Sequence, residues 1–303
     1  MPTLRTLPKA RDNISFLYFE HCRIEQDDRA IAIFKEKDKF LLPCASIATL
    51  LLGPGTSITH AAIKALAEGA CEVHWVGEDV LKFYAGGKGA SGNTDRLQHQ
   101  ANIWADSLKR LAVVRRMYEF RFPGTLPEDL TLQQIRGHEG VRVRSIYAEM
   151  SAKTNVEWQK RDYKTTDWQD ADPINRALST ANSCLYAVCQ AALNSVGYSP
   201  GLGFIHIGKP LSFAYDIADL YKAETTIPAA FEAVASMPTD LDSTVRRKCR
   251  EKFVEYRLMQ KLVPDIDRLL QYGTPDDEAE PICFLWDNQL ETVEGGKNWG
   301  DEN

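Results

Sequence analysis

Two aspartates and a histidine in the C-terminal half have the types and spacing that could hold a divalent cation. Asp216 and Asp219 are three residues apart in a segment that Pro210 could open as a helix, so they would share one face. Neighbouring carboxylates repel each other unless a cation or a basic group lies between them. His206 lies just before this segment, where a turn could return it to the same site. The pattern alone is more often that of a solvated helix face with an unrelated histidine.

Glu139 is a further acidic candidate, and it lies between two glycines inside a predicted helix. A glycine in a helix interior costs about 1 kcal/mol, which would be useful if something large must approach the backbone closely. Arg136, Arg142 and Arg144 crowd the same turns, as a phosphate-binding surface requires. The alternative interpretation is that Glu139 simply pairs with Arg142 or Arg136.

The elements that position these residues fall into two regions, of which the first is β-rich. Short apolar runs predict strands there, and Thr59 is expected to cap one helix that ends at Gly69. The predicted strands span 14–19, 30–34, 40–43, 47–52, 73–76 and 81–84, and the helix spans about 60–68. The glycine-rich segment 86–93 predicts a flexible linker.

Helical periodicity dominates from Arg96 onward. One apolar helix face, in a run broken by Pro123 and Pro127, is predicted from Leu97, Ala101, Trp104, Leu108 and Leu111. Further helices are expected over about 132–153, 174–196, from about 210, 228–236 and 242–271. The predicted class is α+β, with a small β-rich N-terminal domain followed by an all-α C-terminal catalytic domain. The predicted ranges are 1–86 for the β-rich domain, 87–95 for the linker, 96–271 for the helical domain and 272–303 for a tail.

Charge is distributed unevenly along the 303 residues. The tail, residues 272–303, carries nine acidic residues and one lysine, net −8, whereas the rest of the chain is net +2. Residues 96–164 alone are net +5, and a local basic face can bind phosphates whatever the charge of the whole chain. The tail is expected to be mobile, although residues 282–285 could add a strand to a partner.

Composition excludes several classes of protein. The seven cysteines form no C-x-x-C pair, so zinc ribbons and thioredoxin-like redox sites are not supported, and buried thiols are expected instead. No apolar run approaches the roughly 20 residues of a membrane helix, and the first residues contain no secretory-type apolar segment. A cytoplasmic protein without a membrane partner is expected.

Several motifs follow one another in register along the chain. They include Arg-Gly-x-Glu-Gly at 136–140, His206, and Ser-Phe-x-Tyr-Asp-x-x-Asp at 212–219. Together these motifs resemble the CRISPR-associated integrase/endonuclease family Cas1, and they are most similar to its type I-E branch. The resemblance runs from about residue 10 to residue 270 and also covers Pro-Gly-Thr at 54–56, Thr-His-Ala-Ala at 59–62, Trp-Val-Gly at 75–77 and Asn-Ser-Cys-Leu-Tyr at 182–186.

The resemblance implies a β-rich domain that makes a homodimer and a helical domain with one metal site. Carried over, the metal ligands are Glu139, His206 and Asp219, with Asp216 beside them as a fourth catalytic residue. Oxygen ligands suit Mg²⁺ or Mn²⁺, and one imidazole favours Mn²⁺. The implied reaction is a transesterification, in which the 3′-hydroxyl end of a spacer precursor attacks CRISPR repeat DNA. Two dimers would flank a dimer of the partner protein Cas2 in a heterohexamer.

The DNA substrate that the resemblance implies is a duplex with 3′ overhangs or frayed ends. Aromatic side chains placed near the site could stack on its unpaired bases, and these are Tyr163, Trp168, Tyr186 and Tyr215. An equally weighted alternative makes Tyr186 a core residue. Basic candidates along the DNA path are Lys39, Lys82, Arg136, Lys209 and Arg246.

Two positions depart from the family pattern. His21 stands where type I-E relatives often carry a tyrosine that stacks at the end of the duplex, and His138 stands where relatives tend to be apolar. These departures concern DNA-length measurement more than catalysis. Besides the integrase, two other functions remain open: a non-catalytic DNA-binding scaffold of the acquisition complex, and a stand-alone nuclease of branched DNA.

Overall fold

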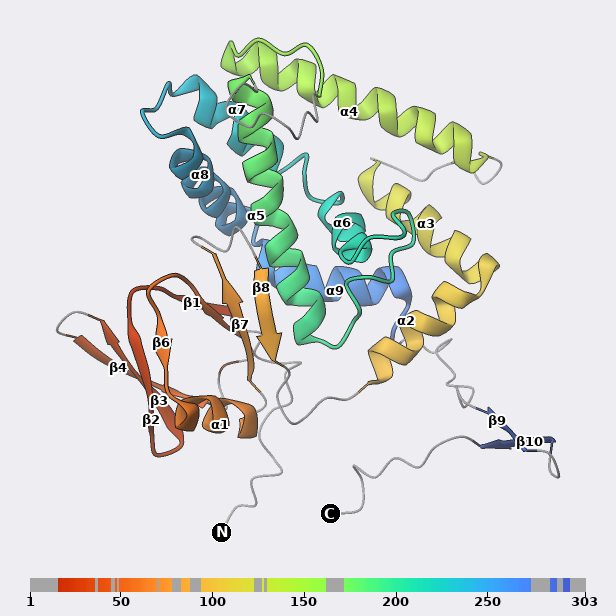
Figure 1. Ribbon diagram of the computed structural model, residues 1–303. Coiled ribbons are helices and arrows are strands. Elements are labelled where there is room, and N and C mark those ends of the chain that lie inside the picture. Colours follow the sequence, from red (N-terminus) through yellow and green to blue (C-terminus); the bar gives the residue numbers. More distant parts are fainter. Residues whose placement is uncertain are drawn as a thin grey trace.

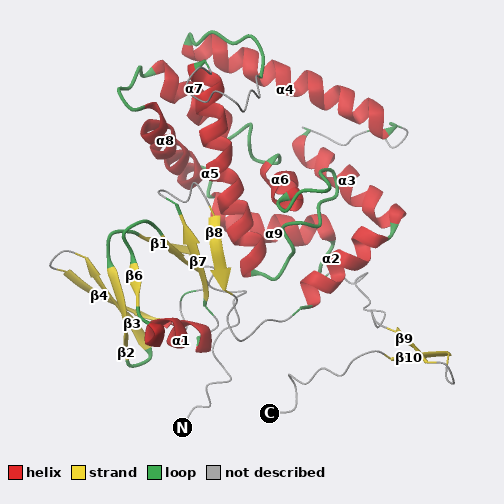
Figure 2. Ribbon diagram, viewed as in Figure 1, coloured by secondary structure: helices red, strands yellow, loops and turns green. Residues whose placement is uncertain are grey.

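The computed structural model describes residues 16–35, 38–44, 47, 49–69, 71–77, 83–87, 94–122, 127, 130–161, 172–273, 284–287 and 291–294. Within these residues, a β-rich region near the N-terminus is followed by a larger helical region (Figures 1 and 2). The α+β class predicted from the sequence is therefore confirmed. Among the described residues, no helix combines the length and the apolar character that crossing a bilayer requires.

Two four-stranded sheets make up the β-rich region. The first has the order β1-β5-β7-β8, in which β1, β5 and β7 are parallel and β8 is antiparallel to β7. The second has the order β4-β3-β2-β6 and is antiparallel except for the β2–β6 pair. The strands are β1 (Phe16–Phe19), β2 (Arg23–Asp27), β3 (Ala30–Lys35), β4 (Asp38–Pro43), β5 (Thr49–Leu52), β6 (Ser57–Ile58), β7 (Glu72–Val76) and β8 (Phe83–Gly87).

Helix α1 (His60–Glu68) joins the two sheets through one apolar core. The Thr59 side chain accepts a hydrogen bond from the Ala62 N–H at 3.2 Å, which is the N-cap that the sequence predicts. Ala62 and Leu66 on α1 pack with Ile24 of β2 and Leu50 of β5, all fully buried. The β-rich region is therefore built as a packed unit with its own core.

The helical region is organised around α5, which packs against α6, α7, α8 and α9. One side of α5 contributes Leu185 and Leu193 to a core shared with α3, α6 and α9, and its N-terminal half contributes Leu178 to a second core with α7 and α8. The helices are α2 (Asp95–Ala105), α3 (Ser107–Arg121), α4 (Leu132–Thr154), α5 (Pro173–Ser195), α6 (Ser212–Ala218), α7 (Thr226–Ala235), α8 (Leu241–Glu255) and α9 (Leu258–Leu270).

The two regions meet where the first sheet faces α5 (Figure 1). Leu51 of β5 and Val76 of β7 form a small buried cluster with Ala191 of α5. The predicted domain limits remain predictions, and β8 extends to Gly87 at the start of the predicted linker.

Two of the predicted helical stretches are each divided in the structure. Asp106 ends α2 and caps α3 by accepting hydrogen bonds from the backbone N–H groups of Leu108 and Lys109. The predicted apolar face is wrong on both sides of this break. Ala101 and Trp104 of α2 are exposed, and on α3 Leu108 is 77% exposed and Leu111 is 44% exposed. Helix α2 buries Gln100 and Ile103 instead. Arg257 has a left-handed backbone with φ of 54°, and it separates α8 from α9 inside the predicted 242–271 helix.

The described part of the tail forms a hairpin. Strand β9 (Phe284–Asp287) pairs antiparallel with β10 (Glu291–Glu294). The segment 282–285, which could add a strand to a partner, therefore overlaps a strand that pairs within this chain. All the described cysteines are free and buried, as expected for thiols that act as small apolar side chains.

Candidate metal and DNA site

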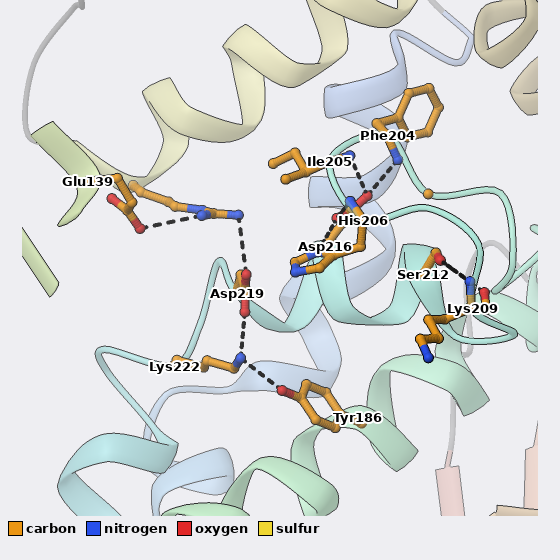
Figure 3. Close-up of polar contacts among 12 residues, drawn as sticks. Glu139, Tyr186, Phe204, Ile205, His206, Lys209, Ser212, Asp216, Asp219 and Lys222 are labelled. Atoms are coloured by element: carbon orange, nitrogen blue, oxygen red, sulfur yellow. Dashed lines mark hydrogen bonds and ion pairs between the residues drawn. The ribbon is translucent and has the colours of Figure 1, made fainter. Parts of the chain in front are cut away.

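Asp216 on α6 is fully buried and accepts four hydrogen bonds from one loop. Its Oδ2 accepts from the backbone N–H groups of Phe204 at 2.6 Å and Ile205 at 3.0 Å. Its Oδ1 accepts from the His206 backbone N–H at 2.9 Å and lies 2.7 Å from Nδ1 of the His206 ring (Figure 3). Because both oxygens are occupied, Asp216 folds the loop and orients the histidine.

The contact with Asp216 determines how His206 can act. A proton on Nδ1 that donates to the carboxylate leaves Nε2 free to bind a cation, and such carboxylate partners are usual for metal-binding histidines. The same hydrogen bond raises the pKa of His206 above its ordinary value, against the opposing effect of burial. The His206 side chain is 43% exposed, so its free edge is accessible.

The carbonyl groups of the same loop are held from the other side by α2 and α3. Trp104 Nε1 donates to the Gly203 carbonyl at 2.9 Å, and the Arg110 guanidinium donates to the Phe204 carbonyl at 3.2 Å. Position 203 requires glycine, because an added Cβ would lie 2.3 Å from the His206 carbonyl oxygen. Thus three elements fix the backbone that carries His206.

Glu139 lies in the middle of α4 and faces two arginines. Arg142, one turn later, donates to it at 2.9 and 3.1 Å, and Arg121 at the end of α3 donates at 3.3 Å. The Glu139 side chain is 14% exposed. The pairing with Arg142 confirms one alternative raised by the sequence, whereas Arg136 is exposed on α4.

Asp219, immediately after α6, lies between two cations. Its Oδ1 is 2.5 Å from Lys222 Nζ, and its Oδ2 is 4.0 Å from the Arg121 guanidinium. Burial by itself would raise the pKa of Asp219, but Lys222 and Arg121 outweigh it and hold the pKa below its ordinary value. Asp219 is therefore ionised, and Figure 3 shows it positioned between Glu139 and Lys222.

Aromatic rings border the same site. Lys222 Nζ donates to the Tyr186 hydroxyl at 2.9 Å, and Tyr186 packs edge-on against Tyr215, which in turn packs edge-on against His206. Burial would lower the pKa of Lys222, but Asp219 and Tyr186 raise it above its ordinary value, so the ammonium is charged. Tyr186 is partly buried rather than a full core residue, and its hydroxyl is directed at the charged cluster.

The donor groups suit a divalent cation, although the described residues contain no ready-made cluster of three potential ligands. The fit rests on the electrostatics: Glu139 and Asp219, from different helices, both face the Arg121 guanidinium. Two carboxylates around one positive charge, with an oriented imidazole beside Asp219, are a donor set for Mg²⁺ or Mn²⁺.

Other predicted residues lie elsewhere. Lys39 on β4 pairs with Asp27 at 2.8 Å, and His21, exposed with φ of 50°, lies between β1 and β2; both belong to the β-rich region. Lys209 is exposed in the loop before α6, Arg246 lies on α8, and His138 is exposed on α4. Lys82, Tyr163 and Trp168 lie outside the described residues.

Sequence reasoning missed Arg121 and Lys222. Lys222 could have been found, because it follows Asp219 by three residues, a spacing at which opposite charges meet on a helical turn. Arg121 offers no such local signal, since it approaches Glu139 from eighteen residues away in the chain.

Comparison with known proteins identifies the family of this chain. A family model described as CRISPR associated protein Cas1 matches residues 121–248. "CRISPR-associated endonuclease Cas1 2" of Thermus thermophilus is 47% identical over 99% of this chain and 94% of its own length. "CRISPR-associated endonuclease Cas1" of a Clostridium species is 40% identical over 98% of this chain and 99% of its own length.

A solved structure, "Crystal structure of TtCas1-DNA complex", matches with a TM-score of 0.80 and 48% identity, covering 88% of this chain and 100% of that one. The chain therefore belongs to the Cas1 family of CRISPR-associated endonucleases.

Proposed function

We propose that this protein is a metal-dependent DNA integrase of CRISPR adaptation, which joins the 3′-hydroxyl ends of spacer-precursor DNA to the CRISPR repeat by transesterification. Endonuclease activity at the same site would be its hydrolytic counterpart. The observation that carries the proposal is the convergence of Glu139 and Asp219 on one cationic position, beside a histidine oriented by a buried carboxylate. Membership of the Cas1 family supports it.

In this proposal Glu139, His206 and Asp219 hold Mg²⁺ or Mn²⁺. When bound, the cation would stabilise charge that develops on a phosphodiester and favour a 3′-hydroxyl nucleophile. The chain's own groups do the rest: Asp216 keeps the Nδ1 proton of His206 in place, so that Nε2 presents a lone pair. Lys222, held charged by Asp219 and Tyr186, supplies a fixed positive charge for a phosphate near the site.

The DNA path belongs to the same proposal. Tyr186 and Tyr215 line the site, and Tyr163 and Trp168 would join them in stacking on frayed bases. Stacking at the end of the duplex, weaker than that of a tyrosine, is proposed for His21. Phosphate contacts are proposed for Lys39, Lys82, Arg136, Lys209 and Arg246. A relative solved as a Cas1–DNA complex supports DNA binding.

The proposed assembly is a homodimer built through the β-rich domain, two of which flank a Cas2 dimer in the cytoplasm. The assignment to the type I-E branch rests on the motif likeness and is likewise proposed. Size measurement of the chain with and without Cas2 tests the assembly: a single protomer mass under all conditions would contradict it.

The deciding experiment offers the protein a labelled 3′-hydroxyl duplex and a supercoiled plasmid that contains the CRISPR repeat, with Mn²⁺. Joined product is expected; plasmid cleavage without joining would indicate a nuclease, and DNA binding with neither product a scaffold. Glu139→Gln, His206→Ala and Asp219→Ala should abolish joining while DNA affinity stays near wild type, because lysines and arginines carry the binding. The matched control is Glu149→Gln, which changes an exposed acid on the same helix as Glu139. Full joining by His206→Ala or Asp219→Ala would refute the assignment of ligands.

A further inference from the structure

A buried guanidinium lies between the two carboxylates of the site. Arg121 is only 5% exposed, and its NH1 is 3.3 Å from Glu139 while its NH2 is 4.0 Å from Asp219. Figure 3 shows the two carboxylates that it separates. No other described contact joins Glu139 to Asp219, so Arg121 is the group that electrostatically links α4 to the turn after α6.

Most of the nitrogen atoms of the buried Arg121 guanidinium lack hydrogen-bond acceptors in the described part of the chain. Its Nε and NH2 have no hydrogen-bond partner within the described part of the chain. Buried N–H groups are nearly always satisfied, and a charged donor without an acceptor is costly. Its remaining support is the face of Tyr118, 5.2 Å from the guanidinium. An arginine that only braced the helices would be expected to use its Nε and a terminal nitrogen together, as Arg96 does by donating two bonds to Asp267.

Charge explains why an arginine is tolerated here. Without a cation, Glu139 and Asp219 would face each other across a poorly hydrated space, where like charges repel strongly. The guanidinium neutralises them from the position toward which both carboxylates turn. Arg142 and Lys222 each pair with only one of the two carboxylates.

We propose that Arg121 is a positioning residue that occupies the place of the metal ion in the metal-free protein and competes with the ion for Glu139 and Asp219. The inference rests on the proposed metal site. Arg121 holds the two carboxylates in place before the ion arrives. A divalent ion must then displace the guanidinium from both, so Arg121 lowers metal affinity while it stabilises the empty site.

The test is Mn²⁺ binding by calorimetry, without DNA, in wild type and in Arg121→Met. The variant is expected to bind Mn²⁺ at least tenfold more tightly, because the one cation that both carboxylates share no longer has to be displaced. In the presence of a chelator, the variant should also melt at a lower temperature than wild type. On addition of Mn²⁺, its melting temperature should rise by more than that of wild type. Arg116→Met is the matched control, since Arg116 lies on the same helix and donates to the Leu269 carbonyl rather than to a carboxylate. Its metal affinity should equal that of wild type.

The outcomes separate this inference from the proposed function. Absence of Mn²⁺ binding by both wild type and Arg121→Met would refute the metal site itself, and the inference with it. Binding by wild type that is unchanged or weaker in Arg121→Met would refute the inference alone. Should Arg121→Met not fold, Arg121→Lys tests the same point, because a lysine keeps the charge but lacks the fork that reaches two carboxylates. Its affinity should still rise, and an unchanged or lower value would overturn the proposal.

Discussion

Two aspartates on one helical turn have different tasks here, because their surroundings differ. Asp216 points into the protein and is surrounded by N–H donors of the 204–206 loop, whereas Asp219 faces side-chain cations at the site. A fully buried carboxylate whose two oxygens are held by backbone N–H groups is poorly suited to bind an ion directly, whereas side-chain cations can move away from a carboxylate. The residue pair therefore divides into a carboxylate that positions His206 and a carboxylate that is free to exchange partners.

Replacement of Asp216 by Asn should destabilise the fold and change the pKa of His206. An amide can turn only one oxygen toward the loop, so at least one N–H loses its charged acceptor, and hydrogen bonds to charged groups contribute about 1.5–3 kcal/mol each. We expect Asp216→Asn to lower the free energy of unfolding by about 3 kcal/mol in urea titration. The pKa of His206, followed by NMR, should fall, because the contact that raises it most is lost. An exposed acid, Glu251→Gln, is the control, and an unmoved His206 pKa would contradict this role of Asp216.

The raised pKa of His206 makes metal binding sensitive to pH. The folded metal-free protein holds the proton more tightly than an ordinary histidine, whose pKa is about 6.5. This proton stabilises the metal-free fold at pH values below the unfolded pKa, and that contribution is lost as pH rises through the folded pKa. A bound cation needs the ring neutral, so Mn²⁺ affinity should fall as pH drops through the raised pKa.

Strand transfer against pH, at limiting and at saturating Mn²⁺, measures this competition. The acid-side loss of activity should move to lower pH when Mn²⁺ is abundant. Mn²⁺ should outperform Mg²⁺ at limiting concentration, because Mg²⁺ accepts a nitrogen ligand less readily. An acid limb that ignores the metal concentration would argue that His206 contacts phosphate instead.

At the scale of elements, local signals predicted most helices but not where two of them break. The caps at Thr59 and Thr131, and Pro173 at the start of α5, mark helix starts that the sequence shows directly. The apolar period runs straight through Asp106, so nothing in the pattern showed that α3 turns Leu108 outward. The break at Arg257 depends on a left-handed backbone conformation, which glycine usually signals in a sequence, but this position is an arginine.

The candidate site was predictable to the same extent. The position of His206 before the helix suggested that a turn could return it to the aspartates, and the structure brings His206 into contact with Asp216. The contact of Arg121 with both acids was not predictable, because Arg121 comes from α3 and only tertiary packing brings it to Glu139 of α4 and to Asp219.

The glycines around Glu139 give α4 an open face. A Cβ at Gly137 would meet nothing within 4 Å, and one at Gly140 would meet only the end of Arg144 at 3.5 Å. Neighbouring protein atoms therefore do not explain Gly137, although it costs helix propensity. The open backbone is consistent with the close approach of a ligand as large as DNA.

Gly137→Ala separates these effects. The variant should raise the free energy of unfolding by up to about 1 kcal/mol, since alanine is the better helix former and no clash opposes it. If DNA contacts the backbone there, the same change should reduce DNA affinity or joining. The comparison is Ser145→Ala, another exposed position on α4. A variant that is both more stable and fully active would show that no ligand uses this face.

At the scale of the whole molecule, the charge of the tail, residues 272–303, is opposite to that of the rest of the chain, which is net +2. Tyr272 stacks edge-on with His99 and lies under the Arg96 guanidinium, so the chain is anchored to α2 until just before the tail's acidic run. A tethered segment of net −8 lies at high effective concentration near any basic surface of the same molecule. It can therefore compete with DNA phosphates for lysines and arginines.

Deletion of residues 274–303 should raise non-specific DNA affinity, most strongly at low salt, because screening weakens the competition as ionic strength increases. The test is DNA binding over a series of salt concentrations, with a full-length control in which Asp276, Asp277, Glu278 and Glu280 are changed to the corresponding amides. If charge is the cause, the amide protein should reproduce part of the gain shown by the deletion. If the tail instead docks onto a partner, the deletion should weaken assembly with Cas2 and leave DNA affinity unchanged. If neither DNA affinity nor assembly changes, the tail has no role in either process.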